Sequence, residues 1–255
     1  MTRWTAIVLA GSRPGVDPFA AAHGTDLKAL IPVGGIPMVA RPVAALLEAP
    51  RIDSVRIMAQ QPRRIASVLP TDSRLSVEAS GKTIASTLDA ILADPATPYP
   101  LLITTADHAL LDRAMIADFC DKAEGADVAI GLVERRPLMV RLPQTARTWL
   151  RFRGGAYSGA NLFSFGSARA AKAVNLWRSV EQDRKKGWRV IAALGPVALL
   201  GAVLRLRTLD QLFVTVGGRL GITIRKVEME NPLAAVDVDK PADHELVTAI
   251  LEGRA

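Results

Sequence analysis

The stretch that decides the fold is Ile7-Val8-Leu9-Ala10-Gly11-Ser12-Arg13-Pro14-Gly15, followed by Lys28-Ala29-Leu30-Ile31-Pro32-Val33 and by Gly34-Gly35-Ile36-Pro37-Met38. The apolar run that ends at Ala10 predicts a buried parallel strand. The loop after it contains glycine, which lets a ligand approach the backbone, and consecutive loop amides can cradle anionic oxygens. Arg13 and Lys28 supply cations that can neutralise phosphate charge. The stretch therefore predicts a strand that leads into a triphosphate-binding loop.

This stretch resembles the entry signature of the nucleotidyltransferase superfamily, whose members join a nucleoside triphosphate to a phosphorylated small molecule. The signature is a strand, Leu-Ala-Gly-Gly or Leu-Ala-Ala-Gly, an arginine in the loop, Lys-x-Leu, and a final Gly-Lys-Pro before Met or Leu. The matching residues are Leu9-Ala10-Gly11, Arg13, Lys28-Ala29-Leu30 and Gly35-Ile36-Pro37-Met38. Within the superfamily the chain resembles the MobA-like branch, which is related to molybdenum cofactor guanylyltransferase and to sugar- and polyol-phosphate cytidylyltransferases. It departs from the signature at Ser12, which replaces the second glycine, and at residues 16–25, which lengthen the loop.

The resemblance implies an α/β fold: a three-layer α/β/α sandwich with a mostly parallel, Rossmann-like sheet, as in nucleotide-diphospho-sugar transferases. It also implies nucleotide-binding roles for Leu9, Ala10, Gly11 and Ser12, and catalytic roles for Arg13 and Lys28. The sequence pattern supports the same fold class, because alternating strands and helices favour a parallel sheet. The expected strands are residues 5–9, 55–59, 75–78, 101–105, 128–133, 160–165 and 223–226. The expected helices are residues 38–47, with Pro37 at the start, 63–69, 83–92, 113–122, from about 168, and 244–252.

The composition fits a cytoplasmic enzyme with a substantial core. The chain has 255 residues, of which 49% are hydrophobic, and we expect a single domain over residues 1–255 with residues 135–220 as an acceptor-side helical elaboration. The single cysteine, Cys120, excludes an intramolecular disulfide, and the 3 histidines lack metal-ligand spacing. The first residues enter a strand and lack the layout of a signal peptide.

The whole chain has a net charge of +7, and its positively charged residues are concentrated in its second half. No nucleic-acid motif or interleaved aromatic residues accompany it, so nucleic acid is not the expected partner. The longest apolar run, residues 190–204, is broken by Gly195-Pro196 and is too short to span a bilayer. We expect two short helices there. Residues 178–207 either pack into the core, form a homodimer contact, or lie at the inner face of an anionic membrane, which would make the protein peripheral.

A candidate metal ligand follows the apolar strand at residues 101–105, which ends in Ala106-Asp107-His108. Ligands bind beyond the carboxyl ends of the strands in open α/β sheets. A carboxylate there suits Mg²⁺, which needs oxygen ligands and leaves room for phosphate oxygens. The superfamily has a strand-then-Asp motif at this place, so the resemblance gives Asp107 the metal role. The alternative is that Asp107 caps the next helix.

A second motif lies near the end of the chain. Val236-Asp237-Val238-Asp239-Lys240-Pro241-Ala242-Asp243 resembles the closing motif of the superfamily, with Lys240 where threonine is usual. The resemblance implies that Asp237 joins Asp107 on one Mg²⁺, which would offset the repulsion between the two reacting phosphates. We expect Asp239 to cap or orient the turn, and Asp243 to lie in the first turn of the helix after Pro241, where a negative charge is favourable.

Two further segments have glycine-containing turns. Ser80 and Gly81 are expected to contact the nucleoside, by resemblance, although Gly81-Lys82-Thr83 lacks the preceding glycine of a P-loop. The run from Gly154 to Asn161 resembles the segment that lines the acceptor pocket in sugar-phosphate members. The expected acceptor-binding residues are Arg151, Arg153, Gly155 and Asn161. The alternative is a glycine-rich surface hairpin.

Taken together, the motifs predict transfer of an NMP group from CTP or GTP to a sugar, polyol or cofactor phosphate, with release of pyrophosphate. The acceptor phosphate is largely deprotonated near neutral pH, because its second pKa is about 6, so no general base is required. Two alternatives are kept. One is a glycosyltransferase of related fold that uses a nucleotide-sugar, and the other is a non-catalytic, membrane-associated scaffold.

Overall fold

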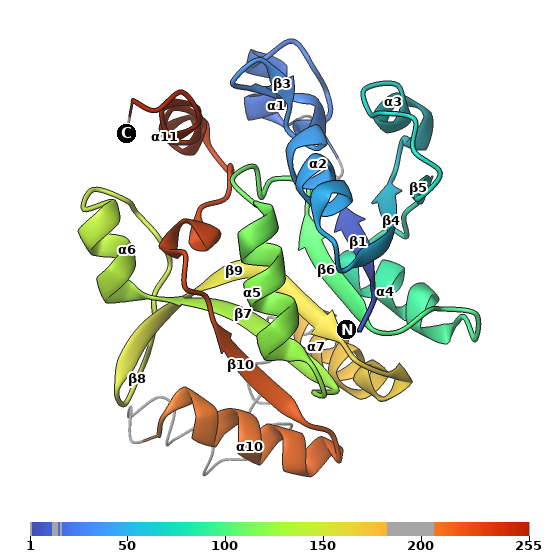
Figure 1. Cartoon of the computed structure of the whole chain (residues 1–255), viewed down its shortest axis with the longest axis vertical. Coiled ribbons are helices and arrows are strands. Elements are labelled where there is room, and N and C mark those ends of the chain that lie inside the picture. The colour runs from blue at the N-terminus through green and yellow to red at the C-terminus, as the bar shows by residue number, and fades with distance from the viewer. Residues whose placement is uncertain (1, 12–14, 16, 183–206, 255) are drawn as a thin grey trace.

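A central sheet runs through the computed structural model, which describes residues 2–11, 15, 17–182 and 207–254 (Figure 1). In this part of the chain the sheet has 8 strands in the order β10-β7-β9-β6-β1-β4-β5, with β8 paired to β9. The bounds are β1 Trp4–Leu9, β4 Ile52–Ala59, β5 Leu75–Ala79, β6 Leu101–Thr105, β7 Val128–Glu134, β8 Leu150–Phe152, β9 Gly155–Phe165 and β10 Ile224–Glu228.

The sheet is mostly parallel, as predicted. Strand β1 is parallel to both of its neighbours, and Ala6 faces Val55 of β4 on one side and Leu102 of β6 on the other. The pairs β4–β5 and β7–β10 are also parallel, whereas β9 is antiparallel to both β6 and β7. The parallel strands β4, β1 and β6 therefore have their carboxyl ends at one edge, where a ligand site is expected.

Helices cover both faces of the sheet, which gives the predicted three layers (Figure 1). Successive side chains of β1 point to opposite faces. Ala6 and Val8 belong to the core that contains Leu46 of α2, whereas Ile7 belongs to the core that contains Leu88 of α4. The helices are α1 Pro18–Ala22, α2 Ala40–Glu48, α3 Pro62–Ala66, α4 Ile84–Ala93, α5 Arg113–Ala123, α6 Arg135–Arg141, α7 Ala171–Gln182, α10 Leu209–Leu220 and α11 Pro241–Leu251. Short 3-10 turns lie at η1 Lys28–Leu30, η2 Ala168–Ala170 and η3 Pro232–Ala235.

The start of helix α5 shows that Asp107 is not its cap. The Asp112 carboxylate accepts a hydrogen bond from the Met115 amide at 2.7 Å and is the N-cap of α5. Helix α4 begins at a capping box in which Thr83 and Ser86 exchange hydrogen bonds. The carboxylate of Asp107 is therefore available for another role.

The predicted start of the first helix is wrong. Pro37 lies in the strand β3 (Ile36–Pro37), which pairs with β2 (Pro32–Val33), and helix α2 begins at Ala40. Gly34 and Gly35 connect these two strands with φ values of 54° and 76°. A two-residue hairpin loop of this kind needs positive φ at both positions, which glycine adopts freely.

Several elements were not predicted, and one predicted segment lies outside the described residues. The sequence did not indicate α1, α6 or α10, and β9 begins at Gly155 rather than at residue 160. The two helices expected within residues 190–204 lie outside the described residues, as does most of the segment 178–207. Within the described part, no helix is long and apolar enough to cross a membrane.

Candidate active site at the carboxyl edge of the sheet

The ends of β1 and β6 bring the opening motif next to the first candidate carboxylate. Leu9 and Thr105 are register partners, and the Ala106 amide donates to the Leu9 carbonyl at 3.0 Å. Gly11 follows β1, and a Cβ atom at this position would lie 3.1 Å from the side-chain amide nitrogen of Gln60. A glycine at this position leaves the backbone accessible at the end of the strand.

Lys28 connects the two ends of the chain at this edge. Its ammonium group donates to Asp107 Oδ2 at 2.8 Å and also forms an ion pair with Asp239. Burial lowers the pKa of Lys28, but the charges and hydrogen bonds of Asp107 and Asp239 outweigh burial and raise the pKa above its ordinary value. The lysine is therefore a fixed positive charge at the carboxyl edge of the sheet.

A cavity of about 30 Å³ lies beside this lysine. Its lining comes from the opening motif and from the turn after β6: Leu9, Ala10, Gly11, Lys28, Ala29, Met38, Ala106 and Asp107. The residues quoted for the opening motif and the Asp107 motif thus meet around one small cavity.

Both oxygens of Asp107 have hydrogen-bond donors. Thr105 donates its hydroxyl to Oδ1 at 2.5 Å, and Lys28 donates to Oδ2. The backbone of the same residue holds the closing motif, since the Val238 amide donates to the Asp107 carbonyl at 3.0 Å. This one backbone bond brings the carboxylates of the closing motif to the end of β6.

Asp239 was expected to cap or orient the turn, and its side chain does not cap it. The N-cap of α11 is Lys240, without a side-chain cap hydrogen bond, and the Asp239 carboxylate instead lies on Lys28. Asp243 does occupy the first turn of α11, as predicted. Its Oδ2 accepts from the Asp239 amide at 3.2 Å, which orders the turn from within.

Asp237 is a partly buried carboxylate with both positive and negative neighbours. Burial is the main cause that raises the pKa of this carboxyl, and the charges of Asp239 and Asp107 raise it further, whereas Arg147 and Asn161 act in the opposite direction. The Arg147 guanidinium forms an ion pair with Oδ1, and the Asn161 amide donates to Oδ2 at 3.0 Å. The Asp237 carboxylate is therefore held by one cation and one amide at this edge of the sheet.

The donor set fits a divalent cation of the magnesium type. Asp107 and Asp237 supply carboxylate oxygens, and Mg²⁺ is usually held by one or two carboxylates together with waters and substrate phosphates. Within the described residues no group of three or more His, Cys, Asp or Glu side chains could hold a metal ion by itself. A magnesium ion here would therefore need phosphate oxygens to complete its shell.

The predicted nucleoside contacts lie after β5. The Ser80 amide donates to the Ala59 carbonyl of β4 at 2.9 Å, and its buried hydroxyl has no hydrogen-bond partner among the described residues. Gly81 donates its amide to the Thr87 hydroxyl at 3.0 Å, and a Cβ atom there would lie 2.5 Å from the Ser86 hydroxyl. The turn therefore has no room for a side chain at position 81, and the Ser80 hydroxyl has no partner among the described residues.

The predicted acceptor residues separate into two groups. Arg151, Arg153 and Gly155 lie on the hairpin of β8 and β9, where both arginines are exposed. Asn161 lies further along β9 and contacts Asp237. In the part of the chain that the structure describes, no hydrogen bond or ion pair joins either arginine to Asp107, Asp237 or Asp239. Ser12 and Arg13 lie outside the described residues.

Sequence reasoning missed Arg147, which binds both Asp237 and Asp243. It also missed the pairing of Asp239 with Lys28. Arg147 lies between α6 and β8 without any motif around it, and its only sequence signal was membership of an arginine-rich stretch.

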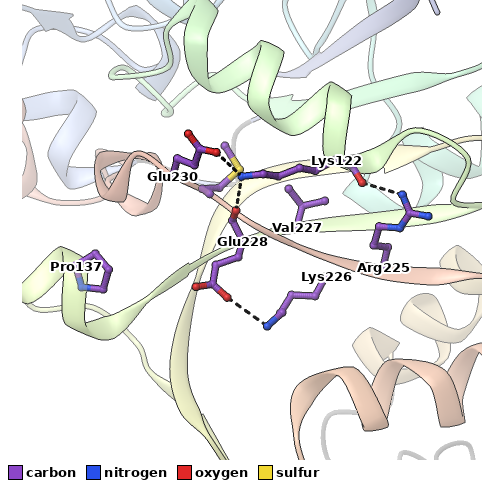
Figure 2. Close-up of a pocket in the computed structure, with 8 residues that line it drawn as sticks. Lys122, Pro137, Arg225, Lys226, Val227, Glu228 and Glu230 are labelled. Carbon is purple, nitrogen blue, oxygen red and sulfur yellow. Dashed lines mark hydrogen bonds and ion pairs between the residues drawn. The ribbon is translucent and has the colours of Figure 1, made fainter.

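A larger cavity, of about 600 Å³, lies at the edge strand β10 (Figure 2). Its charged groups bind one another: Lys122 pairs with Glu230, Lys226 pairs with Glu228, and Arg225 donates to the Lys122 carbonyl (Figure 2). None of the residues quoted for the motifs lines this cavity. It is therefore not the candidate active site.

The comparison with family models gives the class of protein. Residues 6–206 match the model of the MobA-like NTP transferase domain, and the chain belongs to that family. It is thus a nucleotidyltransferase-type enzyme, of a family that generally uses a divalent metal ion. No curated protein matches the chain.

Solved structures of other proteins share this fold. The chain is similar to a hypothetical transferase from Thermus thermophilus, with 28% identity and a TM-score of 0.79 over 95% of this chain and 100% of that one. It shares the fold of 4-diphosphocytidyl-2C-methyl-D-erythritol synthase from Anaerococcus prevotii, with 12% identity and a TM-score of 0.62 over 98% and 96% of the two chains. It also shares the fold of 2-C-methyl-D-erythritol 4-phosphate cytidylyltransferase from Thermus thermophilus, with 17% identity and a TM-score of 0.51 over 99% and 100%.

Proposed function

We propose that this protein is a Mg²⁺-dependent nucleotidyltransferase that transfers an NMP group from CTP or GTP to a phosphorylated small molecule and releases pyrophosphate. The acceptor class is a sugar, polyol or cofactor phosphate. The observation that carries the proposal is the position of Lys28, which is held between Asp107 and Asp239 beside the Gly11 backbone. A cation, an accessible backbone turn and carboxylates at one edge are the groups that an NTP and its metal ion require.

The binding roles follow from the charges. Lys28 and Arg13 bind the triphosphate and the departing pyrophosphate, and the backbone of Leu9, Ala10, Gly11 and Ser12 receives its oxygens. Asp107 and Asp237 would hold the Mg²⁺ ion. When bound, that ion would offset the repulsion between the α-phosphate and the acceptor phosphate. Lys28 would then exchange a carboxylate oxygen for a phosphate oxygen, which is possible because its flexible stem carries a compact charge.

The remaining substrate contacts belong to two segments. Ser80 supplies a hydroxyl for the nucleoside that has no partner among the described residues, beside the tight turn at Gly81. Arg151 and Arg153, with Gly155 in the same hairpin, offer positive charge to the acceptor phosphate. In this proposal the chain forms one domain, residues 1–255, in which residues 135–220 bind the acceptor.

No protein base is needed for the attack, since the acceptor phosphate is largely deprotonated near neutral pH. His108, the residue next to Asp107, is buried, and burial lowers its pKa from 6.5 to about 4, so it stays neutral. The side chains therefore act by positioning the two phosphates in line and by stabilising the charge that develops on pyrophosphate.

A thermal-shift screen of the four NTPs, with and without Mg²⁺, tests the binding step. We expect CTP or GTP to stabilise the protein in the presence of Mg²⁺. Pyrophosphate release is then measured with a panel of sugar, polyol and cofactor phosphates as acceptors. Turnover of a nucleotide-sugar without pyrophosphate would indicate a glycosyltransferase instead, and failure to bind any NTP would indicate the scaffold.

A further inference from the structure

Two side chains of the segment 135–220 bind the two oxygens of Asp237. The Arg147 guanidinium pairs with Oδ1, and Asn161 donates its amide to Oδ2 at 3.0 Å. The carboxylate is 24% exposed and the arginine 7% exposed, so neither has much freedom to reorient in water. The orientation of Asp237 is therefore set by this pair of donors.

Arg147 also holds the turn that carries the carboxylates. Its second terminal nitrogen donates to Asp243 Oδ1 at 3.0 Å in the first turn of α11. The other oxygen of Asp243 accepts from the Asp239 amide. A planar guanidinium presents its donors to two carboxylates in a rigid fork, whereas the donors of an ammonium group rotate. One buried arginine thus fixes the path of the chain from Asp237 to Asp243.

The backbone of β9 is bent at Asn161. The register between β7 and β9 shifts between the pairs Ile130–Phe163 and Leu132–Gly159, so β9 has extra residues at this point. Such a bulge re-aims the side chain at its centre. Asn161 has a φ of 48°, in the left-handed region that is unfavourable for most non-glycine residues. Strain of this kind persists where the surrounding structure requires the conformation.

We propose that Arg147 and Asn161 are positioning residues, which hold the Asp237 carboxylate in the orientation that receives the divalent cation. The inference rests on the proposed function of the site. Carboxylates that bind metals are oriented by neighbouring donors, and loss of such a donor typically weakens metal binding by about 10- to 100-fold. The consequence is that the acceptor-side segment and the metal site are coupled through Asp237.

The test uses the full chain and three variants. Asn161→Gly removes the amide and keeps a residue that adopts positive φ without strain. Arg147→Lys keeps the charge and loses the planar fork. Asp243→Asn is the matched control, because it removes the charge from the other partner of Arg147 and leaves Asp237 unchanged. Calorimetry measures the Mg²⁺ concentration that half-saturates the enhancement of NTP binding, and thermal unfolding measures stability.

We expect Asn161→Gly and Arg147→Lys to raise that Mg²⁺ concentration by about 10- to 100-fold, with NTP binding in the absence of Mg²⁺ unchanged. We expect Asp243→Asn to lower the melting temperature without changing the Mg²⁺ requirement.

A wild-type Mg²⁺ requirement in the first two variants would overturn the positioning role. So would an equal shift in Asp243→Asn, since the stability of the turn would then be the cause. If the unaltered protein itself shows no Mg²⁺-dependent NTP binding, the proposed function fails, and the positioning inference fails with it.

Discussion

Replacing Lys28 with alanine is the sharpest test of the nucleotide site. Its ammonium makes a 2.8 Å hydrogen bond to Asp107 and an ion pair with Asp239, whose side chain is 63% exposed. In the substrate complex the same group would bind phosphate oxygens instead. A hydrogen bond to a charged group contributes about 1.5–3 kcal/mol. We therefore expect NTP binding to weaken by about 10- to 150-fold.

The free energy of unfolding should change much less than the free energy of binding. The Asp239 pair is largely exposed, and exposed pairs contribute only about 0–1 kcal/mol. The Asp107 side chain is 21% exposed, so water can replace part of the lost contact. Removing the lysine also removes the cost of burying its ammonium. The net loss of stability is expected to be about 1 kcal/mol or less.

Calorimetry with CTP and GTP at fixed Mg²⁺, together with urea unfolding, measures both quantities. Lys172→Ala removes one positive charge from an exposed position on α7 and is the matched control. An NTP affinity equal to that of the unaltered protein would refute the assignment of Lys28 to the triphosphate. A loss of stability larger than the loss of binding energy would show that the lysine is mainly structural.

Three further predictions concern the surrounding residues. Asp107→Ala should abolish most pyrophosphate release and leave the melting temperature nearly unchanged, because the bond from Val238 reaches the backbone carbonyl, which alanine retains; normal turnover would contradict the metal role. Asp237→Asn should weaken Mg²⁺-dependent NTP binding but stabilise the fold at neutral pH. The pKa of Asp237 is raised, so its protonated form is favoured in the folded state, and that advantage is present below the ordinary value of 3.8 and lost as the pH rises through the raised value. Unfolding measured against pH checks the sign, and a variant less stable than the unaltered protein at neutral pH would contradict it. Gly81→Ala should destabilise the protein by about 1–3 kcal/mol, because the new Cβ would lie 2.5 Å from the Ser86 hydroxyl; urea midpoints that coincide for the two proteins would disprove this.

The central strands could be predicted because their signals are local. Strand β6 occupies Leu101–Thr105, as the apolar run indicated, and β1, β4, β5 and β7 lie within a few residues of their predicted bounds. A short apolar run is typical of a buried strand, because a buried helix is usually longer. The opening motif and Asp107 likewise indicated the family, whose model matches residues 6–206. The closing motif, residues 236–243, lies beyond that match.

Two local signals failed because other contacts override them, one within a neighbouring hairpin and one far along the chain. Pro37 is a good first residue for a helix, but pairing with Pro32 draws it into a strand. An aspartate such as Asp239 suits a side-chain cap of the turn, but its carboxylate lies on a lysine 211 positions earlier in the chain. The hairpin that contains Pro37 is local, and its Gly34-Gly35 turn lies within the same short stretch of sequence. The partner of Asp239 is distant, so no short window of sequence contains both Asp239 and Lys28.

By itself, the sequence therefore determined the class of fold, the strands whose carboxyl ends form the candidate site, and the family to which the chain belongs. Only the tertiary structure decided the environment of the carboxylates. Arg147 lies 90 positions before Asp237, and Asn161 lies 76 positions before it. Their contact depends on a bend in β9 and on the packing of the closing motif against the end of β6. A charge has no preferred partner until folding removes it from water, because water satisfies it equally well everywhere along an unfolded chain.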